Sequence, residues 1–302
     1  MNGEIKYCAF FDVLGYKDDI VLNKDINQVE KLRRLEAIFK AMSGTISGIV
    51  KSINNTLPNS LFIKSFSDSV YLESSNLNLL LFAFHNIFNN AIKYDYLFLL
   101  RAGIVVDWTE HFMDIASLIN NPIDEVMRDE NGNYNPEFYN VVGPGIARAY
   151  LTSENTGLKG MRIIISPEVL NSFNLIPYDE VAFECYYIDI KHPKTPLHKS
   201  DTTRLYFLPI YSSSLMLYEF CWTANFNKNL ITELSNIEEI TTKLETFCYK
   251  AEINKHYIET LKIVEKGLQI NFTMPEHNLK EEAYATLKQR IQDKISQLSK
   301  GT

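Results

Sequence analysis

Two stretches decide the fold of this chain: Phe10-Phe11-Asp12-Val13-Leu14-Gly15-Tyr16 and Lys64-Ser65-Phe66-Ser67-Asp68-Ser69. Each reads as an apolar strand that ends on one aspartate. A carboxylate at the end of a buried strand is costly unless something cationic neutralises it. If the two strands lie side by side, Asp12 and Asp68 reach the same ion, which suggests a site for metal and phosphate.

The pattern around these stretches predicts an α+β fold. Strand-like residues 5–14 are followed by helical periodicity over 27–53, a hairpin of 61–66 and 69–73, a helix over 76–94 and a strand over 97–107. This order of elements is the ferredoxin-like βαββαβ arrangement, in which helices cover an antiparallel sheet. Further strands are expected at 161–165, 181–190 and 204–211, with a helix opened by Gly143-Pro144 and ending near Glu154.

The last third of the chain has a different pattern. Residues 230–266 carry one long helical periodicity, and 276–298 carry a second, strongly charged one. We therefore place a boundary near residue 225, between a domain of residues 1–225 and a helical C-terminal extension of residues 226–302. The extension is expected to pack on the core or on a second copy of it, with a sensory role as the alternative.

The composition narrows the classes of function. The chain has 302 residues, 46% of them hydrophobic, and a net charge of −7, which argues against a general nucleic-acid or anionic-membrane surface. Neither a signal-peptide pattern nor an apolar run of membrane-spanning length is present. The four cysteines have no metal-type spacing, which favours free thiols and a cytoplasmic protein without nucleic-acid or membrane partners.

Four motifs in order resemble the class III nucleotidyl cyclases, the adenylate/guanylate-type cyclase family. Residues 12–16 (DVLGY) resemble its D-[IV]-x-G-[FY] motif, 64–68 (KSFSD) its K-x-x-G-D hairpin, 100–104 (LRAGI) its L-R-x-G-[IV] strand, and 140–143 (NVVG) its D-x-x-G helix entry. The resemblance covers roughly residues 5–210. The stand-alone form looks most like the pyrimidine cyclases of Pycsar anti-phage systems.

The resemblance implies a metal and phosphate site. Two Mg²⁺ or Mn²⁺ ions per site would be held by Asp12, Asp68 and the carbonyl of Val13, and Mg²⁺ prefers such oxygen ligands. The amides of Leu14, Gly15 and Tyr16 would hold phosphate, since Gly15 permits a close backbone approach. The alternatives are a strand-end cap for Asp12 and a turn residue for Asp68.

Base selection, in the same resemblance, falls to Lys64 and Asn140. Purine-type relatives have an aspartate where Asn140 stands, and an amide offers both a donor and an acceptor. This departure puts ATP in doubt and favours UTP first and CTP second. A solvated strand lysine and a plain turn asparagine are the alternative readings of the two residues.

Transition-state stabilisation is the second departure. The family's N-x-x-x-R positions fall on Ala147 and Leu151, which can neither orient ribose nor neutralise phosphate. Arg148 on the same helix and Arg101 on the strand are the candidate replacements. This loss is also the strongest sign of a catalytically dead cyclase-homology module.

Because the family builds its site between two subunits and this chain has one core, activity would need a head-to-tail homodimer with composite sites. The leading hypothesis is a phosphorus-oxygen lyase that converts UTP or CTP to cUMP or cCMP and pyrophosphate. Its product would be a second messenger for a separate cyclic-nucleotide-responsive effector in anti-phage defence. The alternatives are an adenylate cyclase and the dead module, which would bind a nucleotide or a partner.

Overall fold

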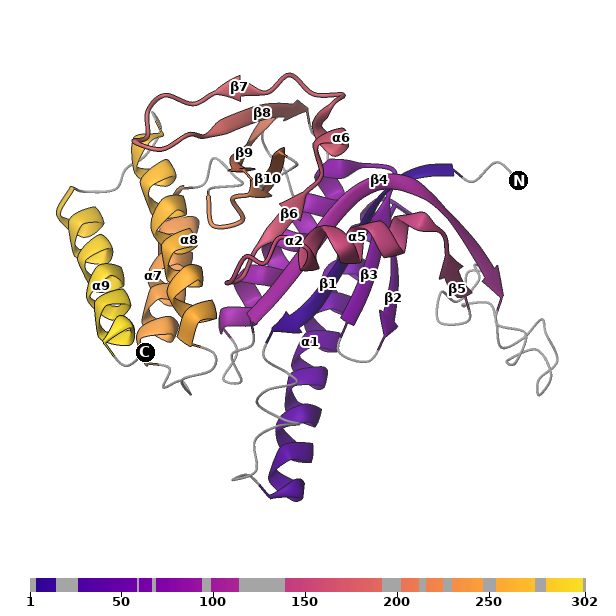
Figure 1. Ribbon diagram of the computed structural model, residues 1–302, viewed down its shortest axis with the longest axis horizontal. Helices are drawn as coiled ribbons and strands as arrows, with labels where there is room; N and C mark the ends of the chain where they lie inside the picture. The colour runs from indigo at the N-terminus through magenta and orange to yellow at the C-terminus, as the bar shows by residue number, and fades with distance from the viewer. Residues whose placement is uncertain are drawn as a thin grey trace.

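The chain is a mixed α+β protein, seen in a computed structural model (Figure 1). The structure describes residues 4–14, 27–58, 60–66, 69–93, 99–113, 139–191, 202–211, 216–224, 230–246, 254–274 and 281–300. Ten strands in these ranges form a mostly antiparallel sheet.

The N-terminal half has the predicted order of elements. These are β1 (Glu4–Leu14), α1 (Gln28–Thr56), β2 (Phe62–Phe66), β3 (Ser69–Ser74), α2 (Leu77–Lys93) and β4 (Leu99–Met113). The strands lie in the order β2-β3-β1-β4, and each neighbouring pair is antiparallel. Strand β1 therefore has a partner on both sides over most of its length.

The two faces of β1 are covered by different helices. Ala9, Phe11 and Val13 point into the large core with α1 and α2, whereas Cys8 lies with Ala149 of α5 (Pro144–Glu154) on the opposite face. Gly103 of β4 allows this close approach, because a Cβ there would lie 2.0 Å from the carbonyl oxygen of Ala149. The alternation of side chains along a strand thus places Asp12 on the α5 face.

Helix α5 begins as the sequence predicts. Gly143 precedes it with φ 138°, a backbone conformation that favours glycine, and Pro144 occupies the first turn. Before it, β5 (Tyr139–Val142) pairs with the far end of β4. After it come β6 (Ile163–Ile165), parallel to β4, and the short α6 (Pro167–Leu170).

The second half of the sheet continues as β10-β9-β8-β7. Strands β8 (Tyr186–Lys191) and β9 (Thr202–Tyr211) match expected strands, whereas β5, β7 (Ile176–Pro177) and β10 (Met216–Phe220) were not predicted. All are short, so their periodicity is weak.

The C-terminal helices share the core of the sheet. They are α7 (Leu230–Thr246), α8 (Asn254–Thr273) and α9 (Glu281–Ser299). The prediction of one long helical pattern over residues 230–266 was wrong, because α7 and α8 are two separate helices that contact each other (Figure 1). Lys93 of α2 pairs with Glu239 of α7 at 3.1 Å. The boundary near residue 225 stays a prediction.

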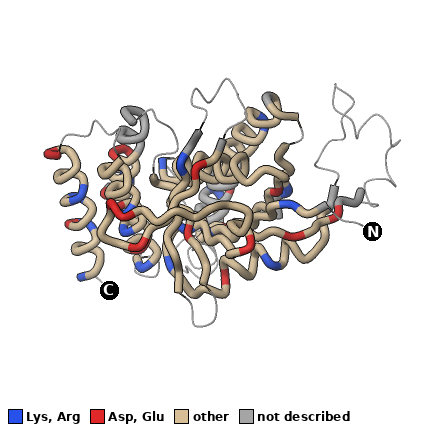
Figure 2. Tube along the Cα trace, turned by 90° about the horizontal axis from the view of Figure 1, so that it is seen from above, with Lys and Arg blue, Asp and Glu red and all other residues tan. Residues whose placement is uncertain are grey.

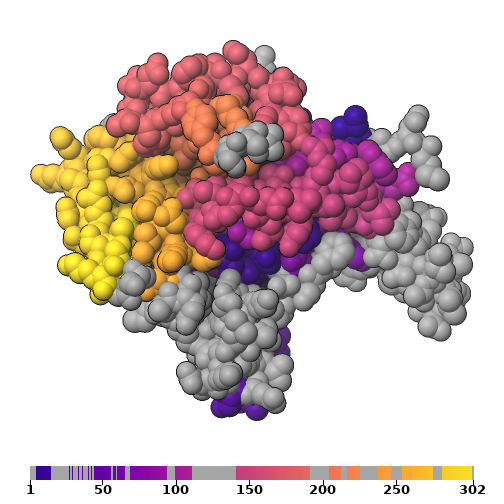
Figure 3. Space-filling view, in the orientation of Figure 1, coloured from indigo at the N-terminus to yellow at the C-terminus, as the bar shows by residue number. Residues whose placement is uncertain are grey.

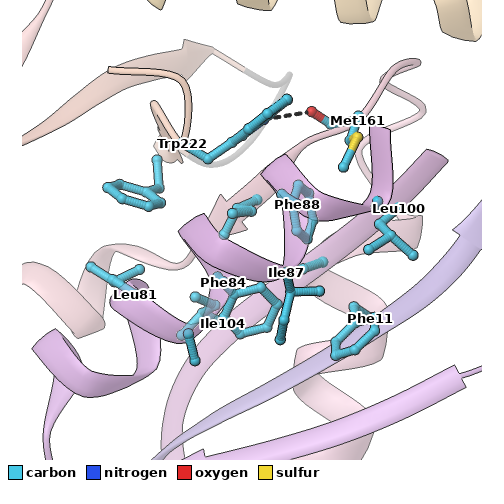
Figure 4. Packing of buried hydrophobic residues seen from close by; sticks show 14 of the residues in the cluster. Phe11, Leu81, Phe84, Ile87, Phe88, Leu100, Ile104, Met161 and Trp222 are labelled. Carbon is cyan, nitrogen blue, oxygen red and sulfur yellow. Dashed lines mark hydrogen bonds between the residues drawn. The ribbon is translucent and has the colours of Figure 1, made fainter. Parts of the chain in front are cut away.

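Aromatic rings connect the sheet to this helical layer. Phe11 of β1 packs edge-on against Phe84 of α2, and Phe88 one turn later contacts Trp222 at a centroid distance of 5.7 Å (Figure 4). The indole Nε1 of Trp222 donates to the carbonyl of Met161 at 2.9 Å. This rigid layer supports the back of the strands that carry the candidate site.

Candidate functional site

Asp12 lies near the C-terminal end of β1 with one neighbouring strand on each side. Its Cα partners are Ser69 of β3 and Arg101 of β4. The hydroxyl of Ser69 donates to Oδ1 of Asp12 at 3.4 Å. Asp12 is half-buried. In the space-filling view, indigo atoms of the N-terminal part of the chain reach the surface below α5 (Figure 3).

The second aspartate of the predicted pair, Asp68, lies outside the described residues. Strands β2 and β3 are paired up to Phe66 and Ser69. Ser69, the residue that follows Asp68 in the chain, is the partner of Asp12. The predicted adjacency of the two strands was wrong, because β3 lies between β1 and β2 and is the direct neighbour of β1. The role of Asp68 stays a prediction.

The predicted phosphate-binding stretch is described only in part. The side chain of Val13 is buried in the core, and Val13 and Leu14 pair with Leu100 and Leu99 of β4. Gly15 and Tyr16 lie outside the described residues. The metal contact of the Val13 carbonyl and the phosphate contacts of residues 14–16 remain predictions.

Arg101 is buried beside Asp12 and is held by the end of α5. Its Nη2 forms an ion pair with Glu154, and Nη1 donates to the carbonyl of Leu158 at 3.5 Å. Burial lowers the pKa of Arg101, and the charge of Asp12 opposes that shift. Sequence reasoning missed Glu154 and Ser69, since both contacts join residues more than fifty positions apart.

Lys64 lies on the same face of the sheet as Asp12. It pairs with Tyr71, and Tyr71 pairs with Phe10, so opposite residues place all three side chains on the α5 face. Strand β3 separates β2 from β1, which puts Lys64 two strands from Asp12, about 10 Å across the sheet. Lys64 and Asp12 therefore share one surface.

Arg148 and Asn140 are not brought to Asp12 within one chain. Arg148 is exposed and forms ion pairs with Asp107 of β4, at 2.6 Å, and with Glu168 of α6. The hydrogen bond to Asp107 is the main cause of its raised pKa. Asn140 pairs with Phe112, eleven residues along β4 from Arg101, a path of about 35 Å. Ala147 and Leu151 are exposed on α5.

A second buried carboxylate lies at the other end of β1. Glu73 accepts hydrogen bonds from Lys6, Tyr71 and Thr109 at 2.7–2.8 Å. Three donors satisfy this buried charge, so the cluster stabilises the sheet. Figure 2 shows acidic and basic positions scattered over the described part of the chain.

The described residues supply one carboxylate toward a metal. No group of three or more His, Cys, Asp or Glu side chains that could hold a metal ion occurs among them. Asp12 is half-buried and accepts a hydrogen bond from Ser69 at 3.4 Å, so a divalent ion here would need Asp68 and substrate phosphate to supply the remaining oxygens. Cys8, Cys185 and Cys221 are buried free thiols, as predicted.

Comparisons with known proteins leave the activity open. No protein-family model matches the chain, and no curated protein matches it. A solved structure of adenylate cyclases from Trypanosoma brucei in their monomeric state aligns with 74% of this chain and 92% of its own, at 9% identity and a TM-score of 0.39. A second such structure covers 74% and 90%, at 10% identity and a TM-score of 0.37. Similarity at this level assigns no activity or substrate.

No helix within the described part of the chain is both long and apolar enough to cross a membrane. The cytoplasmic location stays a prediction.

Proposed function

We propose that this chain is a nucleotidyl cyclase whose active site is built around Asp12. The observation that carries the proposal is the position of Asp12, half-buried at the end of β1 between Ser69 and Arg101. The antiparallel pairing of β1 to β4, in the order β2-β3-β1-β4, supports the proposal of a cyclase-type core. The position of Gly103 under α5 gives the L-R-x-G motif a physical reason.

The proposed reaction makes a 3′,5′-cyclic monophosphate from a nucleoside triphosphate. The ribose 3′-oxygen forms a bond to the α-phosphorus and gives its proton to water, while the bond from that phosphorus to the oxygen that bridges to the β-phosphorus breaks and pyrophosphate leaves with that oxygen. Two Mg²⁺ or Mn²⁺ ions, when bound, supply the Lewis acidity for such a step. Asp12, Asp68 and the carbonyl of Val13 are the proposed ligands, and the amides of Leu14, Gly15 and Tyr16 are proposed to bind the phosphates.

The proposed substrate is a pyrimidine nucleotide, UTP first and CTP second. Lys64 and Asn140 are the proposed base-reading pair, and an amide in place of an aspartate suits the uracil edge, which mixes carbonyls with an N–H. Arg148 and Arg101 are the proposed cations for the developing phosphate charge.

The active form is proposed to be a head-to-tail homodimer. Asp12 and Asn140 lie near opposite ends of β4, so one chain offers them to different sites. A second copy would bring the β5–α5 region of one chain to the Asp12 edge of the other, which gives two equivalent sites. The cyclic product would then act on a separate effector during phage infection.

The catalytically dead module is the second candidate. Arg148 is already paired with two carboxylates, and the exposed Ala147 and Leu151 cannot take over its proposed role. Such a module would bind nucleotide without turning it over.

Incubation of the purified chain with each of the four nucleoside triphosphates and Mn²⁺, read by mass spectrometry of the products, tests the proposal. Cyclic UMP or cyclic CMP from the wild type, and neither from Asp12→Asn, is the expected result. Abundant cyclic AMP would identify an adenylate cyclase instead. Absence of any cyclic product, with retained nucleotide binding, would identify the dead module.

A further inference from the structure

Tyr150 is an exposed aromatic residue whose ring is held in place. It lies in the second half of α5 and is 43% exposed. Its ring packs edge-on against Phe10 of β1, with a centroid distance of 5.5 Å and an interplanar angle of 85°. In an edge-on pair, each ring keeps at least one face that its partner does not cover. Tyr150 therefore presents a positioned aromatic face at the surface.

The aromatic pair lies on the face of the sheet that carries Asp12 and Lys64. Phe10 is two residues before Asp12 in β1, so their side chains share a face. Tyr71 of β3 is opposite Phe10, and Lys64 of β2 is opposite Tyr71, about 10 Å from Phe10 over two strand spacings. Tyr71 is buried, whereas Phe10 and Lys64 are half-buried, so these two are the accessible ends of the row.

Packing of the core does not account for the exposed ring. The buried cluster on this face consists of Cys8, Tyr71, Val105, Val141 and Ala149. Tyr150 and the neighbouring Leu151, which is 46% exposed, lie outside it and extend the apolar surface toward solvent. A positioned aromatic face beside a cation is the combination with which proteins bind nucleobases, because every base has a π-face and phosphate or carbonyl oxygens accept from a lysine.

We propose that Tyr150 stacks against the base of a bound nucleotide, with Phe10 holding the tyrosine ring in position and Lys64 at the edge of the base. The inference rests on the proposed function, because it takes the ligand to be a nucleoside triphosphate. It assigns to Tyr150 affinity that every base shares, and it leaves the choice of base to the proposed pair Lys64 and Asn140.

Isothermal titration of the full chain with 3′-deoxyuridine triphosphate and Mg²⁺ tests the proposal, because this nucleotide lacks the hydroxyl that the proposed reaction consumes. Tyr150→Ala should weaken its binding about 5- to 150-fold, the range for loss of one aromatic partner of a base. Tyr150→Phe should bind it as the wild type does, because the ring is retained. Inorganic tripolyphosphate has no base, so Tyr150→Ala should bind it with wild-type affinity.

Tyr211→Ala is the matched control, since Tyr211 is an exposed tyrosine of β9, in the other half of the sheet, and should leave both affinities unchanged. Equal affinity of the wild type and Tyr150→Ala for the deoxynucleotide would overturn the inference. An equal loss of tripolyphosphate affinity would also overturn it, because the change would then not concern the base. If Tyr150→Ala does not fold, Tyr150→Leu decides by the same two titrations.

The proposed function fails in a distinguishable way. If the wild type binds neither the deoxynucleotide nor tripolyphosphate, the nucleotide site is absent and both proposals fall. If the wild type forms a cyclic nucleotide but Tyr150→Ala binds the deoxynucleotide as tightly as the wild type, the inference alone falls.

Discussion

Two buried arginines on neighbouring parts of the sheet have different surroundings. Every nitrogen of the Arg162 guanidinium donates: Nε to the carbonyl of Lys159, Nη1 to Glu219, and Nη2 to Glu259 at 3.1 Å. Arg101 on β4 has one carboxylate partner, an Nε without a partner among the described residues, and Asp12 beside it. The backbones are joined, because the amide of Ala102 donates to the carbonyl of Arg162.

The difference separates a structural charge cluster around Arg162 from the surroundings of Arg101, a proposed site residue. Around Arg162, two carboxylates from β10 and α8 tie the C-terminal helices to the sheet. Burial raises the pKa of Glu219, and Arg162 opposes that shift. Around Arg101, Nε has no hydrogen-bond partner among the described residues, and the single carboxylate that pairs with the guanidinium belongs to α5.

Arg162→Met should have the largest effect on stability. It leaves Glu219, which is 2% exposed, without its cation, and breaking a buried pair in this way costs about 3–5 kcal/mol. Urea unfolding measures the loss. Arg204→Met is the control, because Arg204 and Asp189 are much more exposed and their pair should contribute less than about 1 kcal/mol. Similar losses of unfolding free energy in the two variants would contradict the assignment of Arg162 to a buried structural charge cluster.

Asp12→Asn should abolish activity without unfolding the protein. If Asp12 is the proposed metal ligand, its loss should lower the rate of cyclic-nucleotide formation by more than about 100-fold, because changes to residues that only orient metal ligands already cost about 10–100-fold. The free energy of unfolding should change by less than about 1 kcal/mol, because Asp12 is half-buried at a strand end. Retained activity would remove Asp12 from the site.

Arg101→Met should destabilise the fold less than Arg162→Met does. Loss of the guanidinium leaves Glu154 without its ion-pair partner. The side chain of Glu154 is 31% exposed, so water can replace the guanidinium there. We expect a cost of about 1–2 kcal/mol in urea unfolding. A cost equal to that of Arg162→Met would show that both arginines are structural.

His85 makes the stability of the helix-covered region depend on pH. Burial lowers the pKa of His85 from 6.5 to about 4, against the hydrogen bond of Nδ1 with the carbonyl of Trp222 and with a smaller contribution from Lys93. Stability from neutral His85 is present above pH 6.5 and is lost as the pH falls toward 4, by about 1 kcal/mol per pH unit. His85→Asn should flatten this slope in urea unfolding measured between pH 7 and pH 4.5. An unchanged slope would show that His85 titrates normally.

The sequence alone predicted the elements with strong local signals. Strand β1, the β2–β3 hairpin and β4 each combine an apolar run with a marked end, and Pro144 marks the start of α5. Strand β10 was missed because Glu219 interrupts its apolar pattern. Its burial depends on Arg162, 57 residues away, which local periodicity cannot reveal.

The sequence alone points to a candidate site residue where burying that residue type is costly in free energy. Asp12 was predicted as a site residue because a carboxylate at the end of a buried strand needs a cation, and its role stays a prediction. Glu154 was not found, because an acidic residue in the last turn of a polar helix is ordinary, and its contact with Arg101 spans 53 positions. Asp68, Gly15 and Tyr16 lie outside the described residues and stay predictions.

The central claim is a cyclase whose site is divided between two copies of the chain, and subunit complementation tests it most directly. Asp12→Asn and the double variant Asn140→Ala/Arg148→Ala are purified, assayed alone, and then assayed after mixing under conditions that exchange subunits. Each should be inactive alone, and an equal mixture should recover about a quarter of wild-type cyclic UMP formation, because half of the dimers are mixed and carry one intact site of two. A mixture no more active than its separate components, beside an active wild type, would contradict the divided site.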